Sequence, residues 1–166
     1  MNIKASKKIN AKAVVRESAV FLVLLVIIIM FSCLSSQFFK FSNFVTILRQ
    51  ISILAIVSVG MTVVLISGGI DLSVGSIVSV VSVLTSMAAV NLNLPVGGAI
   101  IIGLLTGMLM GLFNGTLITS TGMPPMIGTL ATQIAFRGLG FIVCDGASIY
   151  HLPESFKVFG QGYVGP

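Results

Sequence analysis

Long apolar runs follow one another along almost the whole chain, and they constrain its fold more than any other feature. A helix needs roughly 20 apolar residues to cross a bilayer core about 30 Å thick. Only 8% of the 166 residues are charged and 56% are hydrophobic, whereas a soluble globular domain carries about 25% charged residues. So few charges cannot cover a water-facing surface of this size, and the sequence predicts a membrane protein.

Lipid cannot hydrogen-bond the peptide group, so each spanning segment must satisfy its own backbone, which favours helices. We therefore predict an all-α, polytopic transmembrane helix bundle with about five spans, together forming a membrane domain over residues 18–144. The predicted spans cover residues 18–35, 43–67, 72–90, 95–118 and 126–144. A basic segment, 1–17, precedes this domain. The tail, 145–166, is rich in Gly and Pro and is predicted to be an extracytoplasmic loop.

Positive charge gathers ahead of the first apolar run, at Lys4, Lys7, Lys8, Lys12 and Arg16. Such a cluster can bind nucleic acid, but an apolar helix follows it at once, and cytoplasmic flanks of membrane helices carry an excess of Lys and Arg. We therefore expect a cytoplasmic N-terminus and no nucleic-acid partner. A cleaved signal peptide is the alternative for this segment. The equally apolar remainder of the chain favours a first membrane helix instead.

Small residues recur at every fourth position in the fourth predicted span. They are Ala99, Gly103, Gly107, Gly111 and Gly115. Small residues at this spacing let helix backbones approach closely in lipid. We predict that this small-residue ladder packs against neighbouring helices.

Asp71 lies in the stretch SGGIDLSVGS, between two apolar runs, where a bare carboxylate is costly. Gly68 and Gly69 weaken the helix before it, by roughly 1 kcal/mol each relative to alanine. An acid or a serine can cap the helix that follows, so Asp71 and Ser73 are predicted to mark a helix break. A discontinuous helix beside a translocation path is a second interpretation, compatible with the first.

Two further polar side chains lie inside predicted spans. Asn114 sits beside the small-residue ladder, and Arg137 lies well inside the fifth span. Ionisable groups in a membrane mark functional sites or face a protein interior. Both residues are candidates for the substrate pathway, and each can instead serve only to tie helices together.

The sequence contains no recognisable catalytic set. His151 is the single histidine and has no metal-ligand partner near it in the chain, and no Walker phosphate loop is present. Cys33 and Cys144 are too few for a disulfide framework or a zinc site, and a single bridge between them stays open as an alternative. We expect no metal, no cofactor and no enzymatic activity.

Three blocks of sequence carry a family resemblance: GGIDLSVGS, GLFNGTLI and PPMIGTLATQIAFRGL. In this order and spacing they resemble the sugar permeases of bacterial ABC importers of the ribose, galactose and xylose type, which are related to branched-chain amino-acid permeases. The likeness covers nearly the whole chain. Family members often have Phe, Val and Gly where this chain has Met126, Gly128 and Ala131. Family permeases are much longer and have two related halves, so the resemblance implies an N-terminal half.

The resemblance implies a permease subunit that carries a monosaccharide across the bacterial inner membrane. It also implies the partners: separate ABC ATPase subunits that hydrolyse ATP, a second permease copy and an extracytoplasmic sugar-binding protein, with membrane lipid around the helices. Two alternatives stay open. One is an ion- or proton-coupled secondary transporter in which Asp71 carries the proton, and the other is a truncated remnant that does not transport.

Overall fold

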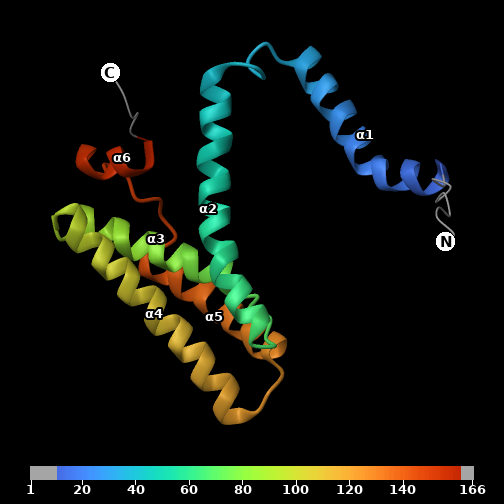
Figure 1. The fold of residues 1–166 in the computed structure, drawn as a ribbon. Coiled ribbons are helices and arrows are strands. Elements are labelled where there is room, and N and C mark those ends of the chain that lie inside the picture. Colours follow the sequence, from blue (N-terminus) through green and yellow to red (C-terminus); the bar gives the residue numbers. More distant parts are fainter. Residues whose placement is uncertain (1–10, 162–166) are drawn as a thin grey trace, which may run out of the picture. The chain divides into compact units, whose positions relative to one another are not determined.

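Helices are the only regular secondary structure in the computed structural model, which describes residues 11–161. The helices are α1 (Ala11–Leu34), α2 (Phe41–Ile66), α3 (Val74–Val90), α4 (Val96–Thr121), α5 (Pro125–Val143) and α6 (Glu154–Gln161) (Figure 1). The predicted all-α class is confirmed. Helices α1 to α5 overlap the five predicted spans, but α1 begins at Ala11, inside the segment 1–17 predicted to precede the first span. The basic residues predicted to flank the membrane at 1–10, and the end of the predicted tail at 162–166, lie outside the described residues.

The chain divides into two units, with the boundary between Ala55 and Ile56 inside α2. The first unit contains α1, the turn after it and the first part of α2. Apolar side chains are exposed on every side of α1 from Val20 to Phe31. In the turn, the rings of Phe31, Phe38 and Phe39 pack on one another, with centroids 6.2 Å and 5.2 Å apart. A helix that exposes apolar groups all round fits a lipid environment.

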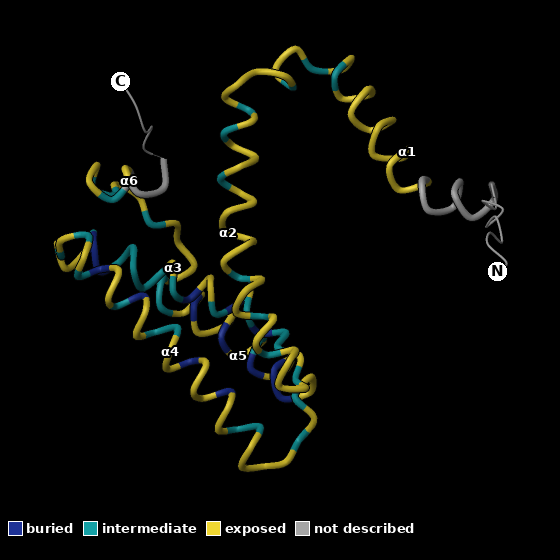
Figure 2. The backbone as a smooth tube through the Cα atoms, in the orientation of Figure 1, coloured by how far each residue is buried: buried dark blue, intermediate teal, exposed yellow. Residues whose placement is uncertain are grey.

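The second unit is built around α3, which packs against both α4 and α5 (Figure 1). Buried residues concentrate where these three helices meet (Figure 2). Val80, Met110 and Phe136 form one core cluster, with one residue from each helix. A second cluster, near the turn between α3 and α4, consists of three alanines: Ala88, Ala89 and Ala99. Helix α2, in contrast, buries no residue.

Helix α3 is the shortest of the first five helices. Helices α2, α4 and α5 are long and apolar enough to cross a membrane, whereas α3 and the apolar part of α1, Ala19–Leu34, are shorter. With 17 residues, α3 is about 25 Å long at 1.5 Å per residue, less than a bilayer core of about 30 Å. Its partner α4 has 26 residues and therefore extends past α3.

The predicted end of the fourth span at Ile118 is too early. Helix α4 continues to Thr121 and ends at Gly122, whose φ is 66° and whose N–H donates to the Ile118 carbonyl at 3.0 Å. Glycine adopts this left-handed conformation without a Cβ clash, which makes it a common helix terminator. Thr119 and Thr121 lie in this last turn, and their hydroxyls donate to carbonyls four residues earlier, at 2.8 and 2.6 Å, which satisfies these polar side chains within the helix.

The tail is not an uninterrupted loop as predicted, because it contains helix α6. Pro153 precedes the helix and Glu154 lies in its first turn, where the helix dipole favours an acid. Phe156 packs against the cluster of three alanines near the turn between α3 and α4. This apolar contact holds α6 within the second unit. The Gly and Pro content of the tail gave no indication of helix α6.

The small-residue ladder of α4 has two different surroundings. Ala99 is fully buried, and a Cβ at Gly103 would overlap the hydroxyl of Thr85 on α3. A Cβ at Gly107 would lie 3.6 Å from Val81 Cγ2. At the last two ladder positions, a Cβ would meet nothing within 4 Å. The first part of the ladder therefore lies against α3, and the last part borders open space.

We predict that Gly103→Ala destabilises the protein by about 1–3 kcal/mol, because the new methyl group forces α3 and α4 apart. Gly97→Ala is the matched control on the same helix, since its Cβ meets nothing within 4 Å; alanine there gains up to about 1 kcal/mol of helix propensity. Thermal unfolding in detergent micelles measures both. Adding Thr85→Ala should restore much of the loss, and equal melting temperatures for Gly103→Ala and Gly97→Ala would contradict the proposed overlap.

Candidate functional site

The chain leaves the helical conformation between α2 and α3, at residues 67–73. Gly68 has a φ of 83°, and its N–H donates to the Leu65 carbonyl at 3.0 Å. The Gly69 N–H donates to the Val64 carbonyl at 3.1 Å. This pair of bonds is the Schellman arrangement that ends many helices, with glycine at the left-handed position. The two glycines therefore end α2 by satisfying its last carbonyls.

Asp71 stabilises the turn that precedes α3. Its Oδ1 accepts the N–H of Ser73 at 2.8 Å and the hydroxyl of Ser73 at 2.6 Å. The predicted cap of α3 by Asp71 or Ser73 is wrong, because no side chain makes a capping hydrogen bond at the N-terminus of this helix. An aspartate that accepts the N–H two residues later forms a local turn. The Asp71 oxygen and the Ser73 hydroxyl are used in this turn and do not cap α3, which begins at Val74.

Asn114 of α4 joins the break to the helix bundle. Its Nδ2 donates to Ser73 Oγ at 2.7 Å. Ser73 is fully buried and Asn114 is only 4% exposed. A carboxylate, a hydroxyl and an amide from two parts of the chain therefore form one hydrogen-bonded series, which we call the Asp71–Ser73–Asn114 chain.

Thr129 of α5 holds the other side of the break. Its hydroxyl oxygen accepts the Leu72 N–H at 3.1 Å and lies 3.2 Å from the Ile70 carbonyl and 2.9 Å from the Pro125 carbonyl, either of which can accept its proton. Thr129 is 1% exposed. The sequence analysis did not select this residue; the available signal was a polar side chain one turn into an otherwise largely apolar helix.

A cavity of about 390 Å³ opens beside the break, between the end of α2, the second half of α4 and the start of α5. The residues that line it are Val64, Ser67, Gly68, Gly69, Ile70, Asp71, Gly111, Asn114, Gly115, Ile118, Thr119, Pro125 and Thr129. Small ligands bind in concave sites of this size that combine apolar walls with a few polar groups. The cavity is therefore the candidate functional site.

Arg137 does not belong to this site. It is exposed on α5, two turns beyond Thr129, where it lines a separate open cavity of about 450 Å³ together with Gln133 and Phe141. The structure thus brings three of the four candidates together, namely Asp71, Ser73 and Asn114, and leaves Arg137 apart.

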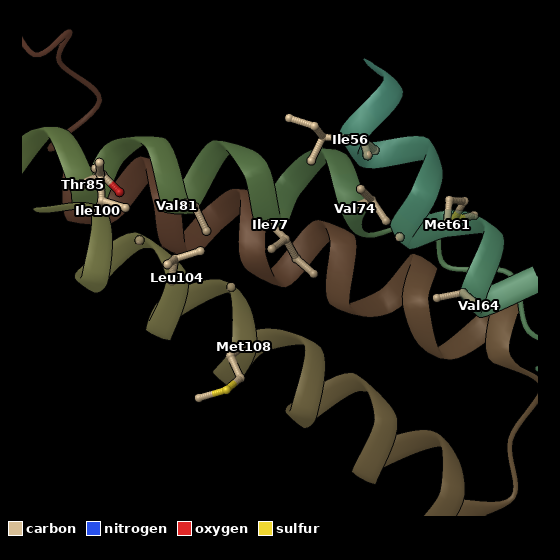
Figure 3. Close-up of a pocket in the computed structure, with 14 residues that line it drawn as sticks. Ile56, Met61, Val64, Val74, Ile77, Val81, Thr85, Ile100, Leu104 and Met108 are labelled. Atoms are coloured by element: carbon tan, nitrogen blue, oxygen red, sulfur yellow. The ribbon is translucent and has the colours of Figure 1, made fainter. Parts of the chain in front are cut away.

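Another cavity of the second unit is larger and mostly apolar. It measures about 760 Å³ and lies between α2, α3 and α4, with apolar side chains such as Met61, Ile77 and Leu104 on its walls (Figure 3). Thr85 also lines it, and its buried hydroxyl oxygen has no hydrogen-bond partner among the described residues. Walls of this kind offer little to a polar solute.

The site can bind and orient a solute, and its groups are suited to hydrogen bonding. In the described part of the chain, no cluster of three or more His, Cys, Asp or Glu residues could hold a metal ion. Cys33 and Cys144 are free thiols, and neither lines the cavity.

Comparison with known proteins shows similarity to membrane permeases. Residues 43–154 match the family described as branched-chain amino acid transport system, permease component. The chain is 40% identical to the ribose import permease protein RbsC of Bacillus subtilis over 159 residues, which is 95% of this chain and 49% of that protein. It is 34% identical to RbsC of Haemophilus influenzae over 152 residues, 89% of this chain and 47% of that protein.

A third relative is named for a different substrate. The autoinducer 2 import system permease protein LsrC of Yersinia pestis is 32% identical over 142 residues, covering 86% of this chain and 40% of that protein. The chain thus spans about half the length of the curated relatives it matches. No solved structure matches the chain significantly.

We predict that Thr129→Val loosens the break, because the Leu72 N–H loses its acceptor inside the protein. A buried donor without a partner costs about 1–3 kcal/mol. The melting temperature of the variant in micelles should therefore be lower than that of the unchanged protein. Thr129→Ser should restore stability, since it keeps the oxygen. The matched control is Thr132→Val, because Thr132 is also buried on α5 but bonds only a carbonyl of its own helix. Equal losses for Thr129→Val and Thr132→Val would contradict the bridging role of Thr129.

Proposed function

Since this chain belongs to the family of branched-chain amino acid transport system permease components, we propose that it forms part of the translocation path of an ATP-driven monosaccharide importer. It acts in the bacterial inner membrane as a non-enzymatic subunit. Sugar crosses between the helices, and the chain changes no covalent bond of its substrate.

One observation carries the proposal: 40% identity to a ribose import permease over 95% of the chain. A second ribose import permease matches at 34%. Ribose is a neutral polyol, and a cavity of about 390 Å³ with acceptor groups on partly apolar walls is chemically suited to such a solute. A pentose is therefore the substrate class that we propose.

The proposed arrangement in the membrane follows the charge pattern. Residues 1–17 lie in the cytoplasm, 18–144 form the membrane domain and 145–166 lie on the outer side. Counting spans from a cytoplasmic N-terminus then puts the break before α3 nearer the cytoplasmic side. The partners in this scheme are a second permease copy, two ATPase subunits and an extracytoplasmic sugar-binding protein.

Within this scheme, the break acts as a fixed element of the path. Non-helical backbone at membrane depth is tolerated where it is buried in protein or lines a cavity, and transporters place substrate sites at discontinuous helices. Asp71, Ser73 and Asn114 hold the break to α4, and Thr129 holds it to α5. A path wall of this kind keeps its shape while the helices around it move.

We predict that a chimera restores ribose uptake to a Bacillus subtilis strain that lacks its ribose permease. The chimera carries this chain in place of the matching part of RbsC. Uptake of radiolabelled D-ribose should stop when arsenate depletes ATP. It should continue when valinomycin and nigericin collapse the ion gradients while glucose maintains ATP. The opposite pattern would establish gradient-driven transport and overturn the proposal; no uptake from a correctly inserted chimera would also count against it.

We predict that Asp71→Asn lowers uptake by less than about tenfold, because an amide oxygen can still accept both hydrogen bonds from Ser73, each weakened by about 1 kcal/mol on loss of the charge. Asp71→Ala removes the acceptor and should reduce uptake to background. Asp145→Asn, at an exposed acid just after α5, is the control. If a folded Asp71→Asn variant is as inactive as Asp71→Ala, the carboxylate itself is required, as a proton-coupled transporter demands.

A further inference from the structure

Arg137 is a cation inside an apolar helix, and the described part of the chain offers it no partner. Its side chain is exposed on α5, and neither a hydrogen bond nor an ion pair joins it to any described residue. A guanidinium at membrane depth is costly, and such groups pair with others or face a protein interior. The exposed position of Arg137 therefore indicates that its partner lies outside the described residues.

One side of α5 is uncovered around this arginine. The stripe of α5 that packs on the bundle runs through Phe136 and Gly140, which contact Val80 of α3 or lie beside it. The open cavity of about 450 Å³ lies on another stripe, and every residue that lines it belongs to α5. We call this stripe the Arg137 face; its residues are Gln133, Ile134, Arg137, Gly138 and Phe141.

The position of Arg137 along α5 argues against a lipid headgroup as its partner. At 1.5 Å per residue, Arg137 lies about 9 Å from Val143, where α5 ends, and about 18 Å from Pro125, where it begins. Helical side chains lean toward the N-terminal end of their helix. The guanidinium is therefore directed away from the nearer end of α5 and toward Gln133, so its partner is expected at membrane depth.

The chemistry of the Arg137 face fits a helix that carries a carboxylate. Arginine presents a planar fork of N–H donors, which binds a carboxylate through two parallel hydrogen bonds. Gln133 lies one turn away on the same face, and its amide can hydrogen-bond across a pair of membrane helices. A Cβ at Gly138 would meet nothing within 4 Å, so this glycine leaves room for another helix to come close.

A second copy of this chain does not supply that carboxylate. Its four acidic residues are Glu17, Asp71, Asp145 and Glu154. The first precedes the apolar part of α1, and the last two follow α5. Asp71 already accepts two hydrogen bonds from Ser73, and its break is held by Thr129, two turns of α5 away from Arg137. Copies inserted in the same direction present equal residues at equal depths, so none of the four acids faces Arg137.

We propose that the Arg137 face is an interface between helices, at which Arg137 forms an ion pair with an Asp or Glu inside a transmembrane helix that this chain does not contain. The curated relatives are about twice as long as this chain, and their unmatched part is the source of the helix. Of the two roles that the sequence leaves open for Arg137, the structure favours joining helices. The proposal depends on neither the substrate nor the energy source of transport.

The first test compares this chain alone with the chimera in which it replaces the matching part of Bacillus subtilis RbsC. In the chain alone, Arg137→Leu removes an unpaired cation and should raise the melting temperature in micelles. In the chimera, the same change leaves a buried carboxylate without its partner and should lower the melting temperature by about 5–10 °C. Lys40→Leu is the control, since Lys40 is an exposed cation in the turn before α2, and it should shift both proteins alike.

The second test identifies the partner by exchanging charges. In the chimera, Arg137→Glu should lower the melting temperature at least as much as Arg137→Leu, because it sets two carboxylates against each other. Each Asp and Glu in the apolar runs of the RbsC part is then changed singly to Arg. One of these changes should restore most of the loss, which is the coupling expected of residues in contact. The same change should not restore a chimera that carries Lys40→Glu.

Three outcomes would overturn the proposal. The first is a lower melting temperature for Arg137→Leu in the chain alone, which would show that Arg137 stabilises this chain by itself. The second is an Arg137→Glu chimera that no single exchange restores. The third is a melting temperature of the chain alone that rises with the phosphatidylglycerol content of nanodiscs and does not rise in Arg137→Leu, which would assign Arg137 to a lipid headgroup.

The result can be separated from the proposed transport function, because every readout is a melting temperature. Restoration by charge exchange without ATP-driven ribose uptake would keep the interface and reject the importer. ATP-driven uptake by a chimera in which no exchange restores stability would keep the importer and reject the interface.

Discussion

Backbone groups that leave a helix inside a lipid-embedded protein must find new partners, and the break before α3 depends on this constraint more than any other part of the structure. The α2 end is satisfied by the Schellman bonds at Gly68 and Gly69. On the far side of the break, the Thr129 hydroxyl receives the Leu72 N–H, and Asp71 receives the Ser73 N–H. These four N–H groups find their acceptors within residues 64–73 or on α5, so they do not depend on water for a hydrogen bond.

The short length of α3 determines where the break lies. Because α4 is longer than α3, its last turns extend past the first turn of α3. The non-helical segment and the cavity occupy the space that this difference leaves. The small-residue ladder of α4 serves both parts: its first residues lie against α3, and its last residues border the cavity.

The sequence predicts features that depend on composition or on neighbouring residues, and it misses those that depend on distant contacts. Apolar runs give the positions of α1 to α5, and Gly68 and Gly69 give the break. The Asp71–Ser73 pair is only two residues apart, so its part in a turn could be anticipated. The bonds from Ser73 to Asn114 and from Leu72 to Thr129 connect residues 41 and 57 positions apart, and hydrophobic periodicity carries no information on such pairs. Helix α6 was missed because its anchor, Phe156, depends on alanines of α3 and α4.

The central claim is that the break is enclosed by α4 and α5 and held by hydrogen bonds, and backbone hydrogen exchange of the chain in lipid nanodiscs tests it most directly. The structure predicts that the amides of Leu72 and Ser73 exchange on the order of a hundredfold more slowly than those of the loop at 148–151, because their opening requires loss of the bonds to Thr129 and Asp71. Exchange of residues 72 and 73 at the rate of that loop would show that the break is open to water and would contradict the account.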